Sequence, residues 1–117
     1  MNLGPEIVGW RAWRVVETPL GLRLASVLYD DLWEPGRVAV AHCEHHDPPA
    51  AGCACGFHAA KDREAALPYL VGRDERGTVD RVLGLVALYG RVIEHEHGWR
   101  AERAYPLSFW RRAALRP

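Results

Sequence analysis

The chain has 117 residues, of which 49% are apolar and 26% charged, and its 15 basic residues balance its 15 acidic ones. This length and composition are typical of one globular domain and exclude a disordered or fibrous chain. Zero formal charge argues against a protein that wraps nucleic acid over its whole surface, although it leaves room for a local basic patch.

No run of residues approaches the roughly 20 apolar residues that a helix needs to span a bilayer. The opening residues, MNLGPEIVGW, lack the basic and apolar regions of a signal peptide. We therefore expect a cytoplasmic protein without a membrane partner. In that reducing compartment, three cysteines close together in the sequence indicate a metal site rather than a disulfide framework.

The first half of the chain predicts short strands joined by turns. Residues 9–18 are rich in aromatic and β-branched side chains, and residues 22–28 alternate apolar with polar, so the two segments predict a β-hairpin. Residues 29–36 end in a Pro-Gly turn signal and predict a loop. Residues 37–41 predict another short strand, which leads into the cysteines.

Segment 43–58 contains two prolines and two glycines besides its Cys and His residues, a content that no regular element tolerates. It therefore predicts a loop that must be held in place by something other than β-sheet hydrogen bonds or a hydrophobic core. Residues 59–70 contain Ala, Arg, Glu and Leu and predict a helix that ends or kinks near Pro68. Residues 72–78 are polar and predict a surface loop.

A long apolar and β-branched segment, residues 81–96, predicts a strand. Gly84 and Gly90 inside it predict bulges or bends of the kind that curl a sheet toward a barrel. A tight turn at His97-Gly98 leads to a predicted strand over 99–105.

Pro106 can open a last short helix over 107–115. The whole chain, 1–117, therefore predicts a single β-rich α+β domain. Its parts are a curved, mostly antiparallel sheet or partial barrel, one helix after the metal-binding loop and a short C-terminal helix.

The tetrapeptide Gly-Trp-Arg-Ala occurs twice, at residues 9–12 and 98–101. A match of this length is a weak sign of duplication. We instead expect two strands in the same kind of environment, each with a buried Trp and a solvated Arg, which could be neighbours in one sheet.

The spacing of Cys43, His46, Cys53 and Cys55 predicts the metal ligands. Cys-x-x-His places two ligands on one short loop and Cys-x-Cys places two on a second, and zinc takes four nitrogen or sulfur ligands in a tetrahedron. Glycines on either side of the Cys-x-Cys pair allow tight turns around the ion. Four protein ligands make a closed, structural site, whereas catalytic zinc keeps one position open.

The nitrogen ligand has alternatives in the sequence. His58 follows Cys55 after two intervening residues and is nearly as well spaced as His46, and His42 and His45 also lie close. If no His binds the metal, three Cys leave an open zinc site. Three Cys and one His also suit a [2Fe-2S] cluster or thiol redox chemistry.

The pattern Cys43-x2-His46-x6-Cys53-x-Cys55-Gly, followed by Glu-His-Glu-x-Gly-Trp-Arg-Ala at 94–101, resembles a group of small uncharacterised bacterial proteins. The resemblance covers most of the chain and implies a metal-binding loop but no activity. In that group position 58 is not reliably His, which favours His46 as the ligand.

A second candidate site consists of His95, Glu96, Trp99 and Arg100. An imidazole beside a carboxylate can perform acid–base chemistry, and the indole offers a stacking surface. No nucleophile or further ligand accompanies them in the sequence, so they predict a ligand-binding site or, alternatively, a small enzyme. A complete catalytic constellation is not evident.

Several of the five tryptophans are followed by Arg, a pattern with two explanations. Such pairs can stack on bases and hold phosphates, or can be core tryptophans with arginines that reach solvent. Trp10 and Trp13 have opposite parity on a strand, so one of them must lie outside the main core, under a helix or in a ligand groove. We expect a zinc-stabilised binding module that contacts nucleic acid or a protein through a Trp/Arg face.

Overall fold

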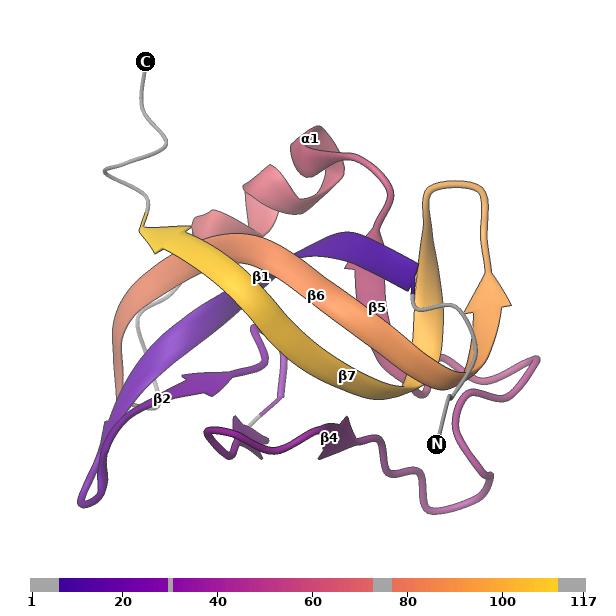
Figure 1. Ribbon diagram of the computed structural model, residues 1–117, viewed down its shortest axis with the longest axis horizontal. Helices are drawn as coiled ribbons and strands as arrows, with labels where there is room; N and C mark the ends of the chain where they lie inside the picture. Colours follow the sequence, from indigo (N-terminus) through magenta and orange to yellow (C-terminus); the bar gives the residue numbers. More distant parts are fainter. Residues whose placement is uncertain (1–6, 30, 73–76, 112–117) are drawn as a thin grey trace.

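The computed structural model describes residues 7–29, 31–72 and 77–111 (Figure 1). Within these residues no helix has the length and apolar character needed to cross a membrane. The strands are β1 (Ile7–Thr18), β2 (Gly21–Ala25), β3 (Leu32–Trp33), β4 (Ala39–Val40), β5 (Phe57–Ala60), β6 (Thr78–Glu94) and β7 (Gly98–Arg111), and the helices are α1 (Arg63–Ala66) and the 3-10 helix η1 (Leu67–Leu70).

The strands form an antiparallel sheet that curls into a partial ring. β6 pairs with β1 along one edge and with β7 along the other. β5 pairs with β7 over four residues and meets β1 where Trp10 lies opposite Ala60, so β1, β6, β7 and β5 follow one another around the ring. β2 and β3 continue from β1, and β4 lies on β7. The predicted β-rich, curved antiparallel sheet is confirmed.

Two irregularities bend β6 against β7. The register shifts between Leu85 and Val86 and again between Tyr89 and Val92. Gly90 lies within the second shift with φ 75°, which confirms the predicted bulge there. At Gly84, a Cβ atom would overlap the backbone of Ser108, so this glycine permits β7 to pass close to β6.

The helix predicted over 59–70 is only partly correct. Ala59 and Ala60 belong to β5, where they pair with Trp99 and Gly98 of β7. Alanine favours a helix by a few tenths of a kcal/mol per residue at most, so closure of the ring outweighs its propensity. Helix α1 begins only at Arg63, and Pro68 lies in the 3-10 turn that ends the segment.

The predicted C-terminal helix over 107–115 is wrong for the residues that the structure describes. Residues 107–111 continue β7, with Ser108 opposite Leu85 and Arg111 opposite Val82. The long edge of β6 provides backbone partners for this segment, and Pro106 lies at a register shift, where the strand tolerates it. Residues 112–115 lie outside the described part of the chain.

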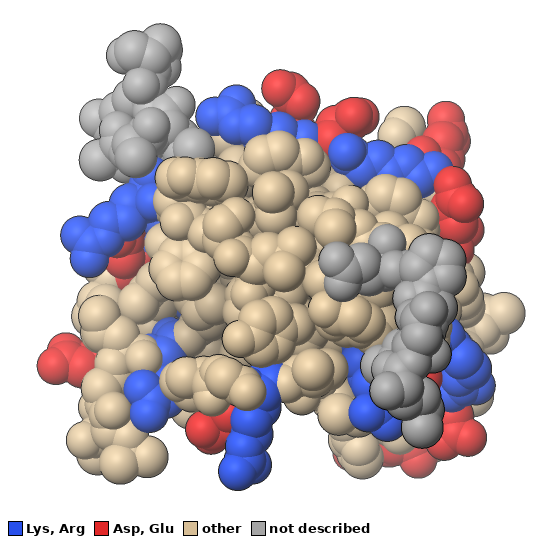
Figure 2. All heavy atoms as spheres, in the orientation of Figure 1, with Lys and Arg blue, Asp and Glu red and all other residues tan. Residues whose placement is uncertain are grey.

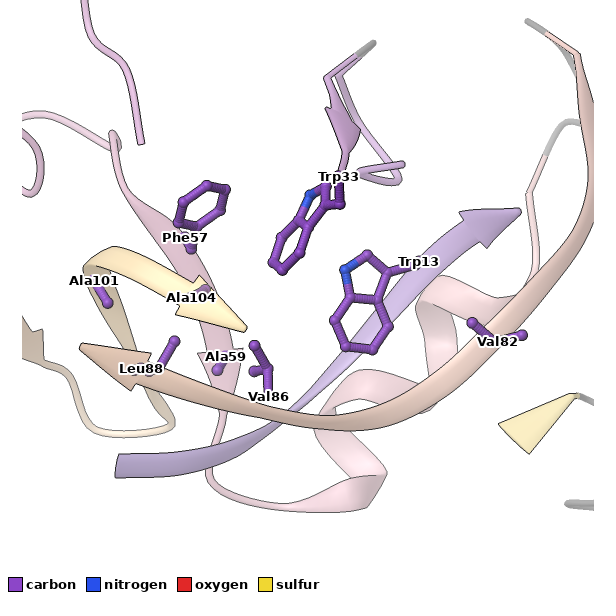
Figure 3. Packing of buried hydrophobic residues seen from close by; sticks show 9 residues of the cluster. All are labelled: Trp13, Trp33, Phe57, Ala59, Val82, Val86, Leu88, Ala101 and Ala104. Carbon is purple, nitrogen blue, oxygen red and sulfur yellow. The ribbon is translucent and has the colours of Figure 1, made fainter. Parts of the chain in front are cut away.

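The core lies inside the ring and is built around aromatic contacts. The ring of Trp33 lies between those of Trp13 and Phe57, with centroid distances of 5.5 and 4.9 Å (Figure 3). Trp10 points to the opposite face of β1, where it packs near the small cluster that α1 and η1 cover. The parity argument for Trp10 and Trp13 therefore holds: one tryptophan lies in the core and the other outside it.

The repeated Gly-Trp-Arg-Ala segments lie on opposite sides of β5. A Cβ atom at Gly9 would come within 2.8 Å of the Ala59 side chain, and one at Gly98 would overlap the Ala59 carbonyl. The two segments share an environment as expected, but β5 separates them. The expectation of a solvated arginine is wrong for Arg100, which is 6% exposed.

Because Gly98 faces backbone atoms of β5, we expect Gly98→Ala to lower the free energy of unfolding by about 1–3 kcal/mol. Val79→Ala is the control, since the Val79 side chain on β6 is 55% exposed and its truncation should change the free energy of unfolding by no more than about 0.5 kcal/mol. Urea unfolding followed by tryptophan fluorescence measures both. An equal loss in the two variants would contradict this account of ring closure.

Candidate metal centre

The four predicted metal ligands lie on the long connection between β4 and β5, at the lower right of Figure 1. Gly52 and Gly56 have φ of 79° and 107°, which places the turns before Cys53 and after Cys55 in the region that glycine adopts without strain. A Cβ atom at Gly56 would also come within 3.1 Å of the Ala101 carbonyl oxygen on β7. Glycine therefore lets this loop lie directly against the sheet.

The structure brings Cys43, His46, Cys53 and Cys55 together, and all four ligand atoms lie within 4.8 Å of one another. The Sγ of Cys43 is 3.9 Å from the Sγ of Cys53 and 3.7 Å from Nδ1 of His46. With zinc bonds of about 2.3 Å to sulfur and about 2.0 Å to nitrogen, a tetrahedron has edges of about 3.8 Å between two sulfurs and about 3.5 Å between sulfur and nitrogen. The cluster therefore has the dimensions needed to hold one tetrahedral metal ion.

His58, the alternative nitrogen ligand, lies outside this group of four. It is on β5, and its Nε2 is 3.0 Å from the carbonyl oxygen of Ala54. A carbonyl only accepts, so Nε2 carries the proton. Burial lowers the pKa of His58, with the nearby Arg11 and Arg100 acting in the same direction, which favours a neutral imidazole.

The Arg100 side chain donates hydrogen bonds to the segment between β4 and β5, residues 41–56, which we call the metal loop. Its Nη1 donates to the carbonyl oxygens of Cys53 and Cys55, the latter at 2.7 Å, and its Nη2 donates to Ala50 at 3.2 Å. Its Nε donates to Nε2 of His95 at 3.0 Å. The sequence suggested Arg100 as a ligand-binding residue, but four hydrogen bonds to the protein occupy its guanidinium. Its observed role is to support the loop that carries the cysteines.

The thiols differ in acidity. A hydrogen bond from the His45 backbone, followed by contacts with His46, lowers the pKa of Cys43 to about 6. Burial raises the pKa of Cys55, and its neighbours Cys53 and Cys43 act in the same direction. A metal ion binds thiolates, so the lowered pKa of Cys43 favours the form of this side chain that binds a metal at neutral pH.

A cavity of about 900 Å³ opens beside the metal loop. His95, Glu96, Trp99 and Arg100, the second candidate site from the sequence, all line it. Its walls come from the metal loop, β1, β5, α1 and the turn between β6 and β7. Sequence reasoning did not select Arg11, which also lines the cavity. Its signals in the sequence were its place in the repeated tetrapeptide and its position directly after Trp10.

The Trp/Arg face expected from the sequence is not one continuous surface. Trp13 and Trp33 are buried in the core, whereas Trp10 and Trp99 line the cavity. On the face in Figure 2, acidic and basic residues alternate around an uncharged centre. Trp110 on β7 is 40% exposed, and its ring centroid lies 6.2 Å from that of Trp10.

Comparison of the chain with protein-family models, with curated proteins and with solved structures gives no match.

The lowered pKa of Cys43 predicts its reactivity in chelator-treated protein. At pH 7 most Cys43 is thiolate, so iodoacetamide should modify it faster than Cys55, and the rate should fall as pH drops through about 6. Peptide mass spectrometry of timed samples measures the site. Preferential modification of Cys55, or a Cys43 rate that halves only near pH 8.5, would contradict this order.

Since Arg100 fixes three carbonyls of the loop, Arg100→Lys should weaken metal binding by about 10- to 100-fold. A lysine keeps the charge but cannot direct several donors in fixed geometry. Arg103→Lys is the control, because Arg103 lies on the same strand and is 47% exposed. Competition with a chromogenic zinc chelator gives both affinities, and equal affinities would contradict the supporting role of Arg100.

Proposed function

We propose that the protein is a small binding module in which one zinc ion, held by Cys43, His46, Cys53 and Cys55, stabilises the loop between β4 and β5. The single observation that carries the proposal is the convergence of these four ligand atoms within 4.8 Å. Residues 41–56, which form this loop, belong to none of the strands or helices of the described chain. A metal ion supplies the cross-link that a backbone ladder would otherwise provide.

The compactness of the cluster supports zinc over a [2Fe-2S] cluster. A two-iron cluster binds two ligands on each iron, so its ligand pairs lie farther apart than the corners around one ion. The observed 3.7 and 3.9 Å separations match a single tetrahedral centre. Three thiolates and one imidazole are a common structural zinc set.

Four protein ligands also support a structural role over a catalytic one, because no position is left for water or substrate. With zinc bound, three thiolates give the centre a net charge of −1, and the Arg100 guanidinium lies next to it. Reduced thiols are a condition of this chemistry, and on that ground we propose a cytoplasmic location.

The binding function rests on the cavity beside the loop. Its tryptophans lie in a concave site and not on an open basic surface, which favours a ligand that enters the cavity over a nucleic-acid strand. In the alternative function, a small enzyme, the candidate residues would be His95 and Glu96, which line the same cavity. His95 Nε2 accepts from Arg100, however, and the Glu96 side chain is 87% exposed.

The matched variants His46→Asn and His58→Asn test the centre. We expect the purified wild-type protein to be colourless with one zinc per chain by elemental analysis. His46→Asn should lose most of its zinc under mild chelation and melt at a lower temperature, whereas His58→Asn should keep its zinc.

A brown, iron-containing wild-type protein would contradict the zinc assignment. Equal zinc retention in the two variants would contradict His46 as the ligand, and loss only in His58→Asn would transfer that role to His58.

A further inference from the structure

The cavity beside the metal loop has the size of a small-molecule site. Its volume of about 900 Å³ lies within the range of roughly 300–1,000 Å³ typical of ligand pockets. Cys53 and Ala54 of the metal loop form part of its wall. The inference below therefore rests on the proposed function, since the metal would hold that part of the wall in place.

One face of the sheet supplies the polar end of the cavity. His58 on β5 lies opposite Arg100 on β7, so the two side chains project from the same face. Ala60, two residues after His58, packs in the small cluster under the helices, which places this face opposite the main core. Arg100 donates from Nε to Nε2 of His95, which brings the turn between β6 and β7 to the same face. Two imidazoles and one guanidinium therefore line this end of the cavity.

The cations that line the cavity within the described chain, Arg11 and Arg100, already have partners in the protein. Arg100 donates four hydrogen bonds to the metal loop and to His95. Arg11 donates to the His58 carbonyl at 2.8 Å and to Ser26 Oγ at 2.9 Å, and this hydroxyl donates in turn to the Asp31 carboxylate at 2.8 Å. The two arginines are thus occupied as structural groups, which leaves the imidazoles as the polar groups for a ligand.

The two imidazoles have opposite hydrogen-bonding character. A guanidinium only donates, so Nε2 of His95 accepts from Arg100 and the proton of this neutral ring is on Nδ1. In His58, Nε2 donates to the Ala54 carbonyl at 3.0 Å, and Nδ1 is left as an acceptor because burial lowers the pKa of the ring. Within the described chain neither Nδ1 atom has a hydrogen-bond partner. The cavity therefore offers one donor and one acceptor, both uncharged.

The other end of the cavity is apolar. Val27 and Ala66 line it and belong to the small cluster under the helices. Leu28, Tyr29 and Tyr69 also line it, and they are 68%, 68% and 49% exposed. Apolar surface that the protein leaves exposed in a concave site favours a ligand that covers it.

We propose that this cavity binds a small uncharged molecule that has an apolar ring and one amide group. The amide N–H donates to Nδ1 of His58, the amide carbonyl accepts from Nδ1 of His95, and the ring lies against the apolar wall. An amide carries a donor and an acceptor side by side, which matches the two imidazoles. A carboxylate has no N–H and brings a charge that the occupied arginines do not balance.

Benzamide, acetophenone and benzoate test the proposal, because they share a ring and a carbonyl and differ in the third group. Isothermal titration of the full-length, zinc-loaded protein should show that benzamide binds about tenfold more tightly than either of the others. The reason is that acetophenone and benzoate both leave the His58 acceptor unpaired. Zinc content is measured on each sample.

The variants His58→Phe and His95→Phe separate the two roles. The His58 acceptor serves the amide N–H alone, so His58→Phe should remove the preference for benzamide over acetophenone. The His95 donor serves the carbonyl of both probes, so His95→Phe should weaken both and keep the preference. Arg103→Gln is the control, since Arg103 is 47% exposed on β7 and does not line the cavity.

If zinc-loaded wild-type protein binds none of the probes at about 10 mM, or binds benzamide and acetophenone equally, the inference is overturned and the metal centre stands. Tighter binding of benzoate would overturn it in favour of an anion site, and so would a preference for benzamide that survives in His58→Phe. A sample that contains no zinc would contradict the proposed function and, with it, this inference. The wild-type comparison decides the question even if a variant does not fold.

Discussion

The hydrogen bonds of Arg100 connect the parts of this molecule on which its chemistry depends. The side chain starts from β7, is 6% exposed and donates to three carbonyls of the metal loop and to His95. The backbone carbonyls of this loop have no β-sheet partners, and buried carbonyls need hydrogen-bond donors from elsewhere in the protein. A planar guanidinium can serve several at once in fixed directions, which a lysine cannot. The metal ligands and the cavity wall thus share one support.

The position of that loop follows from how the ring closes. β5 has four residues, yet it joins β7 to β1 and carries the chain from the metal loop to α1. Gly9 and Gly98 allow the flanking strands to approach it closely. The register then places the tryptophan after each glycine on opposite faces of the sheet, because Trp10 lies opposite Ala60 and Trp99 lies opposite Ala59. Ring closure therefore separates the two indoles: Trp99 packs against the main core, and Trp10 packs against the small cluster under the helices.

Local patterns in the sequence were enough to predict much of this arrangement. Alternation and β-branching located the long strands, Gly90 marked a bulge, and strand parity separated Trp10 from Trp13. Ligand spacing identified the four residues that the fold brings together. Each of these features depends on a few neighbouring residues.

The predictions that were wrong concern residues whose partners are distant in the sequence. Ala59 and Ala60 look helical alone but pair with residues of β7, and residues 107–111 extend a strand because β6 offers an edge. The burial of Arg100 depends on carbonyls 45 to 50 residues away. The cavity around Arg11 depends on three-dimensional closure in the same way. No local pattern contains such information.

The central claim is that one zinc ion is held by three thiolates and one imidazole. X-ray absorption at the zinc edge tests it most directly, because the spectrum reports the ligand atoms and their distances. The account predicts three sulfurs at about 2.3 Å and one nitrogen at about 2.0 Å. A first shell of oxygen and nitrogen alone, or one with two sulfurs or fewer, would contradict it.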